Sequence, residues 1–367
     1  MKERNLNADL IRCAAVFSVV SVHFLLRTGF YGVPVEGGQM LIMCMYRSLF
    51  MVCVPLFMIL TGYLMWQKTL NRRYYKGIAK TLEIYVMASI VCLLFKKLMQ
   101  GETVTLKSSV LGILDFSAAN YAWYVEMYIG LFLIIPFLNL IYHGLKTQKE
   151  KQVLLVTMMA LTMLPKLVNN FDLTTEGWWL APAMSKEYDQ LVPGFFTAMY
   201  PITYYFIGAY LREYDWRIGR RLNLLLLFLA VALFGAYNYY RSYGVSFIWG
   251  SNCTWGGENL ITAVLLFTLL LHLHPEKWPV VLQKILVYIS GISFGVYLLS
   301  WVSDQIVYQG YLNPLIAEVN MRWKYYPAAV PASFLIAVCG ASVLYFLRSI
   351  CGKIFRSVRD NLTKRHE

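Results

Sequence analysis

The chain has 367 residues, of which 58% are hydrophobic, 16% aromatic and only 14% charged. A soluble domain is usually about half apolar and a quarter charged, so this composition excludes a soluble globular protein and indicates a polytopic membrane protein. The formal net charge of +13 does not point to nucleic acid, because no basic stripe is combined with an RNA- or DNA-binding motif. We therefore expect no nucleic acid among its partners.

Stretches of about twenty mostly apolar residues predict an all-α membrane helix bundle with about ten transmembrane helices. In chain order the predicted spans are 8–27, 41–66, 82–99, 122–143, 152–170, 194–212, 219–239, 258–276, 282–308 and 326–348. The fifth span is the least well defined, because Pro165 and Lys166 lie near its end. The first could belong to a signal peptide, but no small-residue cleavage site follows Leu26, so we expect it to be retained.

The basic residues are distributed unevenly between the two sides of the predicted membrane. With both termini in the cytoplasm, the cytoplasmic pieces carry 22 of the 33 Lys and Arg residues, and the external pieces carry nine. This asymmetry predicts an even number of helices with both termini cytoplasmic. We expect residues 1–351 to form one transmembrane domain and residues 352–367 to form a basic cytoplasmic tail against the inner leaflet.

The cysteines and histidines do not form a recognisable disulfide or metal pattern. Of the seven cysteines, five fall inside predicted spans, Cys351 is cytoplasmic and only Cys253 is external. No disulfide framework emerges from this distribution. His272 and His274 lie near a cytoplasmic turn and lack a third ligand at usable spacing, so we expect no metal.

The predicted external loops are rich in aromatic residues. The richest stretches are EGWWLAPAMSKEYDQ at 176–190, YNYYRSYGVSFIWGSNCTWGGEN at 237–259 and NMRWKYYP at 320–327. Amphipathic rings collect at membrane interfaces, and such a belt is the simpler interpretation. The other interpretation is a stacking surface for a bulky acceptor on the outer face.

Two ionisable residues lie within the first predicted span. His23 lies eleven positions after Arg12, and eleven steps of about 100° come within about 20° of a whole number of turns. The two side chains therefore share one helix face, about 16 Å apart along the axis. Arg12 alone could be an anchor at the cytoplasmic boundary, paired with Asp9. His23 alone could be a packing histidine, but two aligned ionisable residues inside a membrane indicate a functional site.

Other residues are weaker candidates. Glu126, at the start of the fourth span beside Trp123 and Tyr124, could orient His23 or an acceptor hydroxyl, or could simply be exposed at the outer edge. Arg47 and Asp304 lie in different spans, and we expect them to form a structural ion pair.

The segment NADLIRCAAVFSVVSVHF at 7–24 resembles the start of the acyltransferase 3 family of integral membrane acyltransferases, whose hallmark is an Arg, ten residues and a His. The resemblance extends through VPLFMILTGYL at 54–64, YAWYVEMYIGLFLIIP at 121–136, YYFIGAYL at 204–211 and ISGISFGVYLLSW at 289–301. The chain departs from the family pattern at Thr61, where Ser is usual, at Tyr121, in place of a frequent His, and at Ser300, where many members have a second His. The basic cytoplasmic patch of the family is less distinct in this chain, where RRYYKGIAK stands at 72–80.

The resemblance implies transfer of an acyl group, most often acetyl, from acyl-CoA in the cytoplasm to a hydroxyl outside it. CoA carries phosphates, which suit the planar donor fork of arginine. We expect Arg12, Arg73, Lys76 and Lys80 to hold the phosphate end and the pantetheine arm to reach His23. His23 would then act as a general base or as a nucleophile. Glu126 would be a second catalytic group, with Trp123 and Tyr124 contacting the acceptor.

The predicted function is that of a membrane-bound O-acyltransferase, most simply an O-acetyltransferase, acting on a cell-surface glycan or its lipid-linked precursor. Its expected partners are the lipid bilayer, acyl-CoA and the glycan or glycolipid acceptor, and a homo-oligomer is left open. The expected location is a cell membrane, in bacteria the cytoplasmic membrane. The competing class is a transporter of a small polar solute such as an amino acid, because buried charges and helix breaks at proline also suit alternating access.

The charge distribution makes the topology testable. In a cysteine-free background, a cysteine introduced by Lys76→Cys should react with an impermeant maleimide only after the cells are permeabilised, because residue 76 lies in a predicted cytoplasmic loop. Strong labelling of intact cells would contradict the predicted orientation. A cysteine at Lys324, in a predicted external loop, is the matched control and should react in intact cells.

Overall fold

The computed structural model describes the backbone of residues 4–184, 188–249 and 255–363, and side chains as far as Lys353. The α-helices are α1 (Leu6–Arg27), α2 (Gly37–Phe50), α3 (Cys53–Met65), α4 (Arg72–Lys76), α5 (Ala79–Met99), α6 (Leu106–Leu114), α7 (Trp123–Gly144), α8 (Gln148–Thr162), α9 (Leu164–Val168), α10 (Tyr200–Tyr214), α11 (Arg220–Arg241), α12 (Gly257–Leu271), α13 (Val280–Asp304), α14 (Asn313–Leu315), α15 (Val319–Arg322) and α16 (Tyr326–Thr363). Short 3₁₀ turns are η1 (Phe30–Gly32), η2 (Pro182–Met184), η3 (Phe195–Met199), η5 (Pro275–Lys277) and η7 (Trp323–Tyr325), and η6 (Gln305–Leu312) is a π-helix.

The predicted all-helical membrane class is confirmed. In the described part of the chain, seven helical stretches are long and apolar enough to cross a membrane: Leu6–Gly32, Gly37–Met65, Arg72–Met99, Trp123–Gly144, Arg220–Arg241, Val280–Leu315 and Val319–Lys353. The other three predicted spans correspond to α8 with α9, α10 and α12. Helices α8, α10 and α12 have 15 residues each, about 22 Å of helix, against a hydrocarbon core of about 30 Å. The count of ten and the orientation stay predictions.

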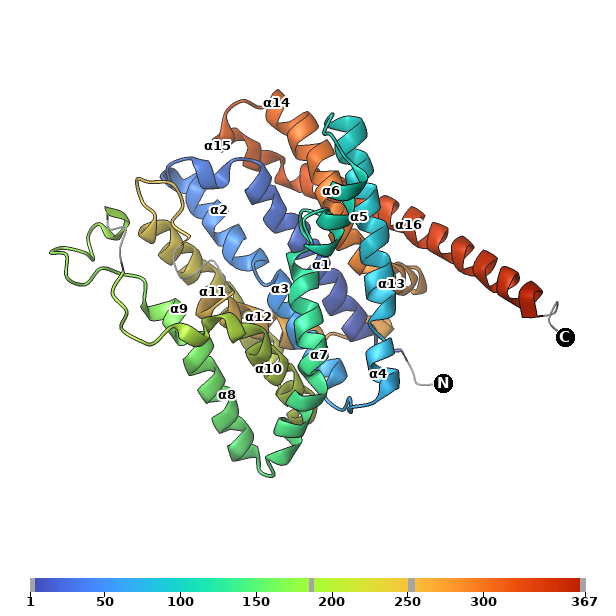
Figure 1. The fold of residues 1–367 in the computed structure, drawn as a ribbon. Coiled ribbons are helices and arrows are strands. Elements are labelled where there is room, and N and C mark those ends of the chain that lie inside the picture. The colour runs from blue at the N-terminus through green and yellow to red at the C-terminus, as the bar shows by residue number, and fades with distance from the viewer. Residues whose placement is uncertain (1–3, 185–187, 250–254, 364–367) are drawn as a thin grey trace.

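Helix α1 runs through the middle of the bundle (Figure 1), where it contacts α2, α3, α12, α13 and α16. Around it α10 packs on α3, α16 on α13, and α11 on α2. The last turns of α16 leave the bundle and project away from it. The predicted tail at 352–367 continues this helix as far as Thr363, and its side chains beyond Lys353 lie outside the described residues.

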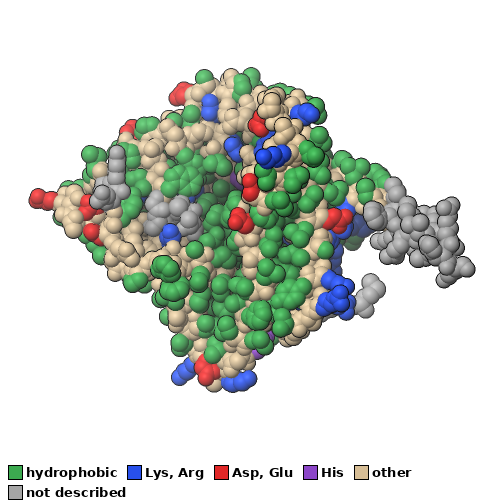
Figure 2. Space-filling model, in the orientation of Figure 1, with side chains coloured by type: hydrophobic (Ala, Val, Ile, Leu, Met, Phe, Trp, Pro, Cys, Tyr) green, Lys and Arg blue, Asp and Glu red, His purple; other side chains and the backbone are tan. Residues whose placement is uncertain are grey.

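Hydrophobic side chains cover most of the middle of the face shown in Figure 2, and charged side chains gather mainly towards its ends. This arrangement is the one expected of a protein whose middle is solvated by lipid tails.

Local sequence explains where the helices begin. The side chain of Asn5 accepts a hydrogen bond from the backbone N–H of Ala8 and caps α1, and Asp9 lies in the first turn, where a negative charge is favourable. Thr147 and Glu150 form a reciprocal capping box at the start of α8. The backbone N–H of Thr147 donates to the Glu150 carboxylate, which lowers the pKa of this exposed group.

The second predicted span is divided into α2 and α3. Proline at position 55 has no N–H to donate to the carbonyl of Met51, so the helical hydrogen-bond ladder is interrupted at Met51 and Val52. The break turns Met51, Cys53 and Val54 towards a cavity that also contains His23.

Two glycines allow α3 and α10 to touch through their backbones, and one of them, Gly62, lies in ILTGYL, where a small residue permits close helix approach. A Cβ atom added to Gly62 would lie 2.0 Å from the carbonyl oxygen of Tyr205, and one added to Gly208 would lie 2.0 Å from that of Ile59. Neither neighbour is a flexible side-chain end, so the helices would have to separate.

We expect Gly62→Ala to lower the thermal stability of the purified protein in detergent, because overpacking a tight interface costs about 1–3 kcal/mol. Gly130→Ala is the matched control: the site has nothing within 4 Å and lies inside α7, where Ala is favoured over Gly by up to about 1 kcal/mol. Equal melting temperatures for the two variants would contradict the close packing of α3 on α10.

Candidate active site

Arg12 lies near the start of α1 in a group of hydrogen-bonded side chains. Its Nη1 donates to the Asp9 carboxylate at 3.2 Å and to Ser290 Oγ of α13 at 2.8 Å. Asp9 is buried and also accepts from Arg4 at 2.6 Å. The predicted pair with Asp9 is therefore present, but both contacts use only Nη1, and the Arg12 side chain is 30% exposed. Nε and Nη2 remain to bind another group.

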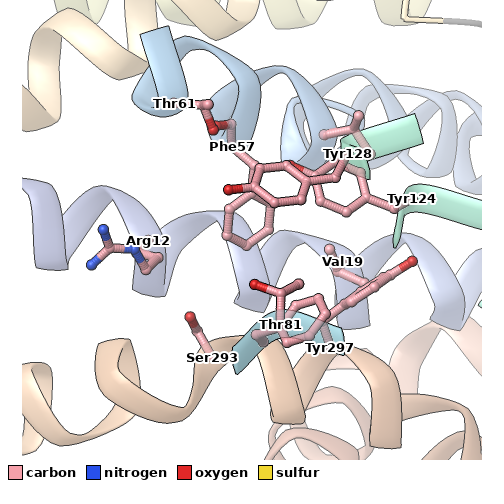
Figure 3. Close-up of a pocket in the computed structure, with 11 residues that line it drawn as sticks. Arg12, Val19, Phe57, Thr61, Thr81, Tyr124, Tyr128, Ser293 and Tyr297 are labelled. Carbon is pink, nitrogen blue, oxygen red and sulfur yellow. The ribbon is translucent and has the colours of Figure 1, made fainter. Parts of the chain in front are cut away.

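Arg12 opens onto a cavity of about 210 Å³ between α1, α3, α5, α7 and α13. Figure 3 shows Arg12 at one end and the aromatic rings of Tyr124, Tyr128 and Tyr297 around the middle. Thr61, Thr81 and Ser293 add hydroxyl groups to this largely aromatic wall. We call this cavity the inner pocket.

The three basic residues predicted to bind CoA lie close to this cavity in the chain. Arg73 and Lys76 are exposed on α4, and Lys80 is exposed at the start of α5, directly before Thr81 of the pocket wall. The start of α5 therefore carries a positive charge next in the chain to a residue of the pocket wall, and α4 carries two more shortly before it.

His23 lies about three turns further along α1 and contacts a buried carboxylate. Its Nδ1 is 3.1 Å from Oδ2 of Asp304, whose side chain is fully buried at the end of α13. Ser300 Oγ lies 3.4 Å from the same nitrogen. Because the carboxylate can only accept, the hydrogen-bond network assigns a hydrogen to Nδ1, and in the neutral ring Nε2 then carries the lone pair.

A second set of contacts fixes Asp304. Tyr121 donates its hydroxyl to Oδ2 at 3.0 Å, and Ser333 of α16 donates to Oδ1 at 2.8 Å. The phenol ring of Tyr121 lies 3.8 Å from the imidazole of His23, centroid to centroid. Arg27, one turn beyond His23, donates from Nε to the Tyr121 oxygen at 2.9 Å. The imidazole is therefore held at its Nδ1 edge by Asp304 and on its face by the ring of Tyr121.

The π-helix η6 follows Asp304 directly and ties this part of α13 to the end of α1. Gln309 and Asn313 both donate side-chain N–H groups to the carbonyl of Arg27. Wide turns of this kind occur frequently at functional sites. The stretch from Asp304 to Asn313 therefore places the carboxylate of Asp304 beside His23 and donates hydrogen bonds to the last carbonyl of α1.

His23 lines a second cavity of about 170 Å³, which we call the outer chamber. Its walls are largely aromatic, and two ring pairs in them are stacked: Trp123 on Trp255 at 4.7 Å, and Tyr31 on Trp249 at 4.1 Å. Trp123 and Trp249 are about 40% exposed, at 39% and 42%. The aromatic loop at 237–259 thus supplies part of a chamber wall, and its residues 250–254 lie outside the described part.

The two cavities share part of their lining along α1. Val19, Val54 and Tyr297 line both the inner pocket and the outer chamber. Arg12 is in the first lining and His23 in the second, so the shared face predicted for these two residues faces a pair of adjoining cavities.

The other predicted site residues have mixed outcomes. Trp123 lines the outer chamber, whereas Tyr124 is buried and lines the inner pocket. Glu126 is exposed and lines neither cavity. The carboxylate that contacts His23 belongs instead to Asp304, because α13 is packed against α1 while Glu126 turns outwards from α7.

The expected pair of Arg47 with Asp304 is wrong. Arg47 Nη1 lies 3.8 Å from Glu258 at the start of α12, and the guanidinium packs 4.5 Å from the ring of Phe247. Helix α2 packs on α11 and α12, so Arg47 meets the nearest buried carboxylate there, and Asp304 is left for His23.

Among the residues that the structure describes, no three His, Cys, Asp or Glu side chains are grouped so that they could hold a metal ion. The polar groups at the two ends of the cavity pair suit a phosphate-bearing molecule on one side and proton transfer on the other.

A family model for an acyltransferase domain matches residues 5–345. The chain belongs to the acyltransferase 3 family. It is therefore a multi-pass membrane acyltransferase, and its transporter interpretation is not supported. Comparisons with curated proteins and with solved structures yield no match for this acyltransferase.

Asp304 and Arg27 are the site residues that sequence reasoning missed. A carboxylate inside a predicted span was a signal, since such groups are costly in lipid unless they have a partner. The assignment of that partner to Arg47 rested on charge alone. Asp304 lies one turn after Ser300, the position at which many members of the family have a second His.

Proposed function

We propose that the protein transfers an acyl group from cytoplasmic acyl-CoA to a hydroxyl of an extracytoplasmic glycan or of its lipid-linked precursor. The observation that carries this proposal is the pair of adjoining cavities along α1, one containing Arg12 and the other His23. A thioester entering through one cavity and a hydroxyl entering through the other would meet where the linings are shared.

The donor half of the proposal depends on charge. The CoA phosphates stay at the basic end, where Nε and Nη2 of Arg12 are available and Arg73, Lys76 and Lys80 add positive charge. The pantetheine arm is narrow and mostly uncharged, which suits the aromatic walls of the inner pocket. In this arrangement the thioester arrives near Val19 and Tyr297, beside His23.

The chemical step needs a base at the meeting point. Nε2 of His23 accepts the proton of the acceptor hydroxyl while its oxygen attacks the thioester carbonyl carbon. The carbon–sulfur bond breaks, and the CoA thiolate takes that proton from Nε2 of His23 and leaves as the free thiol, so that the imidazole is neutral again. Asp304 keeps the hydrogen on Nδ1 and stabilises the imidazolium that forms during the step.

The same geometry favours direct transfer over an acyl-histidine intermediate. Because the inner pocket and the outer chamber adjoin, donor and acceptor can occupy the protein together, and no covalent carrier is needed. The proposal therefore requires sequential kinetics. Ping-pong kinetics with an acylated His23 would assign the nucleophile role instead.

The outer chamber supports the choice of acceptor and acyl group. Stacked indole and phenol rings offer flat apolar faces with polar edges, which suit a sugar ring. The chamber of about 170 Å³ has room for a short acyl group at His23, and we take it to be acetyl. In this proposal the aromatic residues of the outer chamber bind the acceptor, which is the second of the two interpretations of the aromatic loops.

Arg12 tests the donor site. Arg12→Ala removes a charged hydrogen-bond donor worth about 1.5–3 kcal/mol, so acetyl-CoA affinity should fall roughly tenfold to a hundredfold. Arg12→Lys keeps the charge but loses the fork and should fall in between. Calorimetry on the purified protein measures the acetyl-CoA affinity of both variants. Unchanged affinity in a folded Ala variant would contradict a role in donor binding and leave Arg12 only the structural pair with Asp9.

His23 and Asp304 test the chemical step. His23→Gln keeps size and hydrogen bonding but cannot take a proton, so acetyl transfer should fall by about 10² to 10⁴ while acetyl-CoA still binds. Asp304→Asn would present N–H or C=O to Nδ1 without a charge, and should lower kcat strongly with little change in the acetyl-CoA affinity.

Glu126→Gln is the matched control, because Glu126 is an exposed carboxylate of the same region with no place in the site. It should keep full transfer activity and stability. A His23→Gln variant with near-normal activity would contradict the general-base role, and loss of activity in Glu126→Gln would return that residue to the site.

A further inference from the structure

A lateral groove of about 580 Å³ lies away from the proposed site, between α8, α10 and α12. Leu155, Val156 and Met159 of α8 line one wall, and Leu260, Ile261, Val264 and Leu265 of α12 line the other. Residues of α10, on which α8 packs, form the floor, and Figure 1 shows α8 at the edge of the bundle. Val156 is 61% exposed and Ile261 45%, so the groove opens to the surroundings of the bundle, which are lipid.

One end of the groove is polar. Gln148 and Gln152 both donate side-chain N–H groups to the hydroxyl oxygen of Tyr210, at 3.0 and 2.9 Å. All three side chains line the groove, together with Trp216. In both bonds the phenol oxygen accepts, so its own O–H remains to donate to an acceptor oxygen of a ligand. The remaining lining is apolar, and the ligand that fits has a polar head and an apolar tail.

The length of the groove matches one leaflet of a bilayer. From Gln148 to Met159 the wall on α8 rises by about 16 Å, against about 15 Å for half of a hydrocarbon core of about 30 Å. A single acyl chain with its ester group at Tyr210 spans this distance.

One of the three helices that form the groove is too short to cross the bilayer. Helix α12 has 15 residues, whereas η3 runs directly into α10 and α8 is followed after one residue by α9. Helix α12 therefore leaves several ångströms of mismatch with the hydrocarbon thickness on this side of the bundle. A tightly held lipid chain is one way to fill such a gap, because it brings apolar atoms to the place where helix surface is missing.

The polar end carries more positive than negative charge. The basic residues of segments 146–151 and 212–221 are Lys146, Lys149, Lys151, Arg212, Arg217, Arg220 and Arg221, and the acidic ones are Glu150, Glu213 and Asp215. Glu150 is engaged with the backbone of Lys146 and Thr147, and Asp215 with Arg217. The end of the groove therefore favours an anionic head group.

We propose that this groove is a binding site for one acyl chain of an anionic glycerophospholipid, with its ester and phosphate oxygens at Gln148, Gln152 and Tyr210. The site is separate from the cavities at Arg12 and His23, and it does not depend on the proposed reaction. It stabilises the thin side of the bundle and makes the protein sensitive to the lipid composition of its membrane.

A pair of valines on α8 gives a matched test. Val156 lines the groove, and Val153 does not, yet their side chains are almost equally exposed at 61% and 64%. Val156→Trp should fill the groove and Val153→Trp should only add surface. Displacing even two methylenes of a bound chain costs roughly a factor of ten in affinity.

The measurement is native mass spectrometry of the full-length protein in detergent, titrated with phosphatidylglycerol or phosphatidylcholine of the same chains. The unmodified protein and Val153→Trp should retain one phosphatidylglycerol in preference to phosphatidylcholine and melt at a higher temperature with it. Val156→Trp should bind phosphatidylglycerol at least tenfold more weakly, and the lipid should no longer raise its melting temperature. Equal lipid retention by the two tryptophan variants would overturn the proposal.

A second variant tests the head group without altering the groove. Arg220→Gln with Arg221→Gln should weaken phosphatidylglycerol binding by roughly fivefold for each charge removed and leave phosphatidylcholine unchanged. Glycerol phosphate, which has the head group but no chain, should not raise the melting temperature. Stabilisation by glycerol phosphate equal to that by the lipid would overturn the acyl-chain assignment and leave a phosphate site.

Should Val156→Trp fail to fold, Val264→Trp fills the same groove from α12 and takes its place in the titration. Val264→Trp with unimpaired retention of phosphatidylglycerol would count against the proposal in the same way.

Discussion

The cost of placing charge inside a membrane governs the construction of this protein. Asp304 is fully buried, and an isolated carboxylate in lipid is unstable unless it has partners. It has three: His23 from α1, Tyr121 from the turn before α7 and Ser333 from α16. These elements, distant in sequence, are brought together around one negative charge, and the imidazole is oriented as a consequence.

The same rule organises the other end of α1. Asp9 is buried and shared between Arg4 and Arg12, with Ser290 of α13 as the fourth member. Helices α1 and α13 are thus joined by polar groups at two levels, and the cavities occupy the space between those levels. In the proposed reaction, the spacing from Arg12 to His23 sets the distance over which the acyl donor extends.

Much of the framework follows from sequence because apolar length and helical periodicity are local properties. The face shared by Arg12 and His23, the close approach at Gly62 and the helical class all depend on one segment at a time. The partners of charged residues depend on which helices become neighbours, and no local pattern contains that information. The pairing of Arg47 with Asp304 therefore failed, and the role given to Glu126 ignored the direction in which α7 presents it.

The break between α2 and α3 shows how a local feature acquires a role in the site. Pro55 removes one backbone donor and ends the ladder at Met51, a defect that lipid would penalise because it leaves a carbonyl without its partner. The defect is tolerated inside the bundle, where Met51, Cys53 and Val54 face the outer chamber instead of lipid. In an uninterrupted helix, Met51, Cys53 and Val54 would point in different directions, because successive residues are about 100° apart. The interruption places an irregular stretch of this span in the wall of the outer chamber, beside His23, and in the proposed reaction the acceptor approaches there.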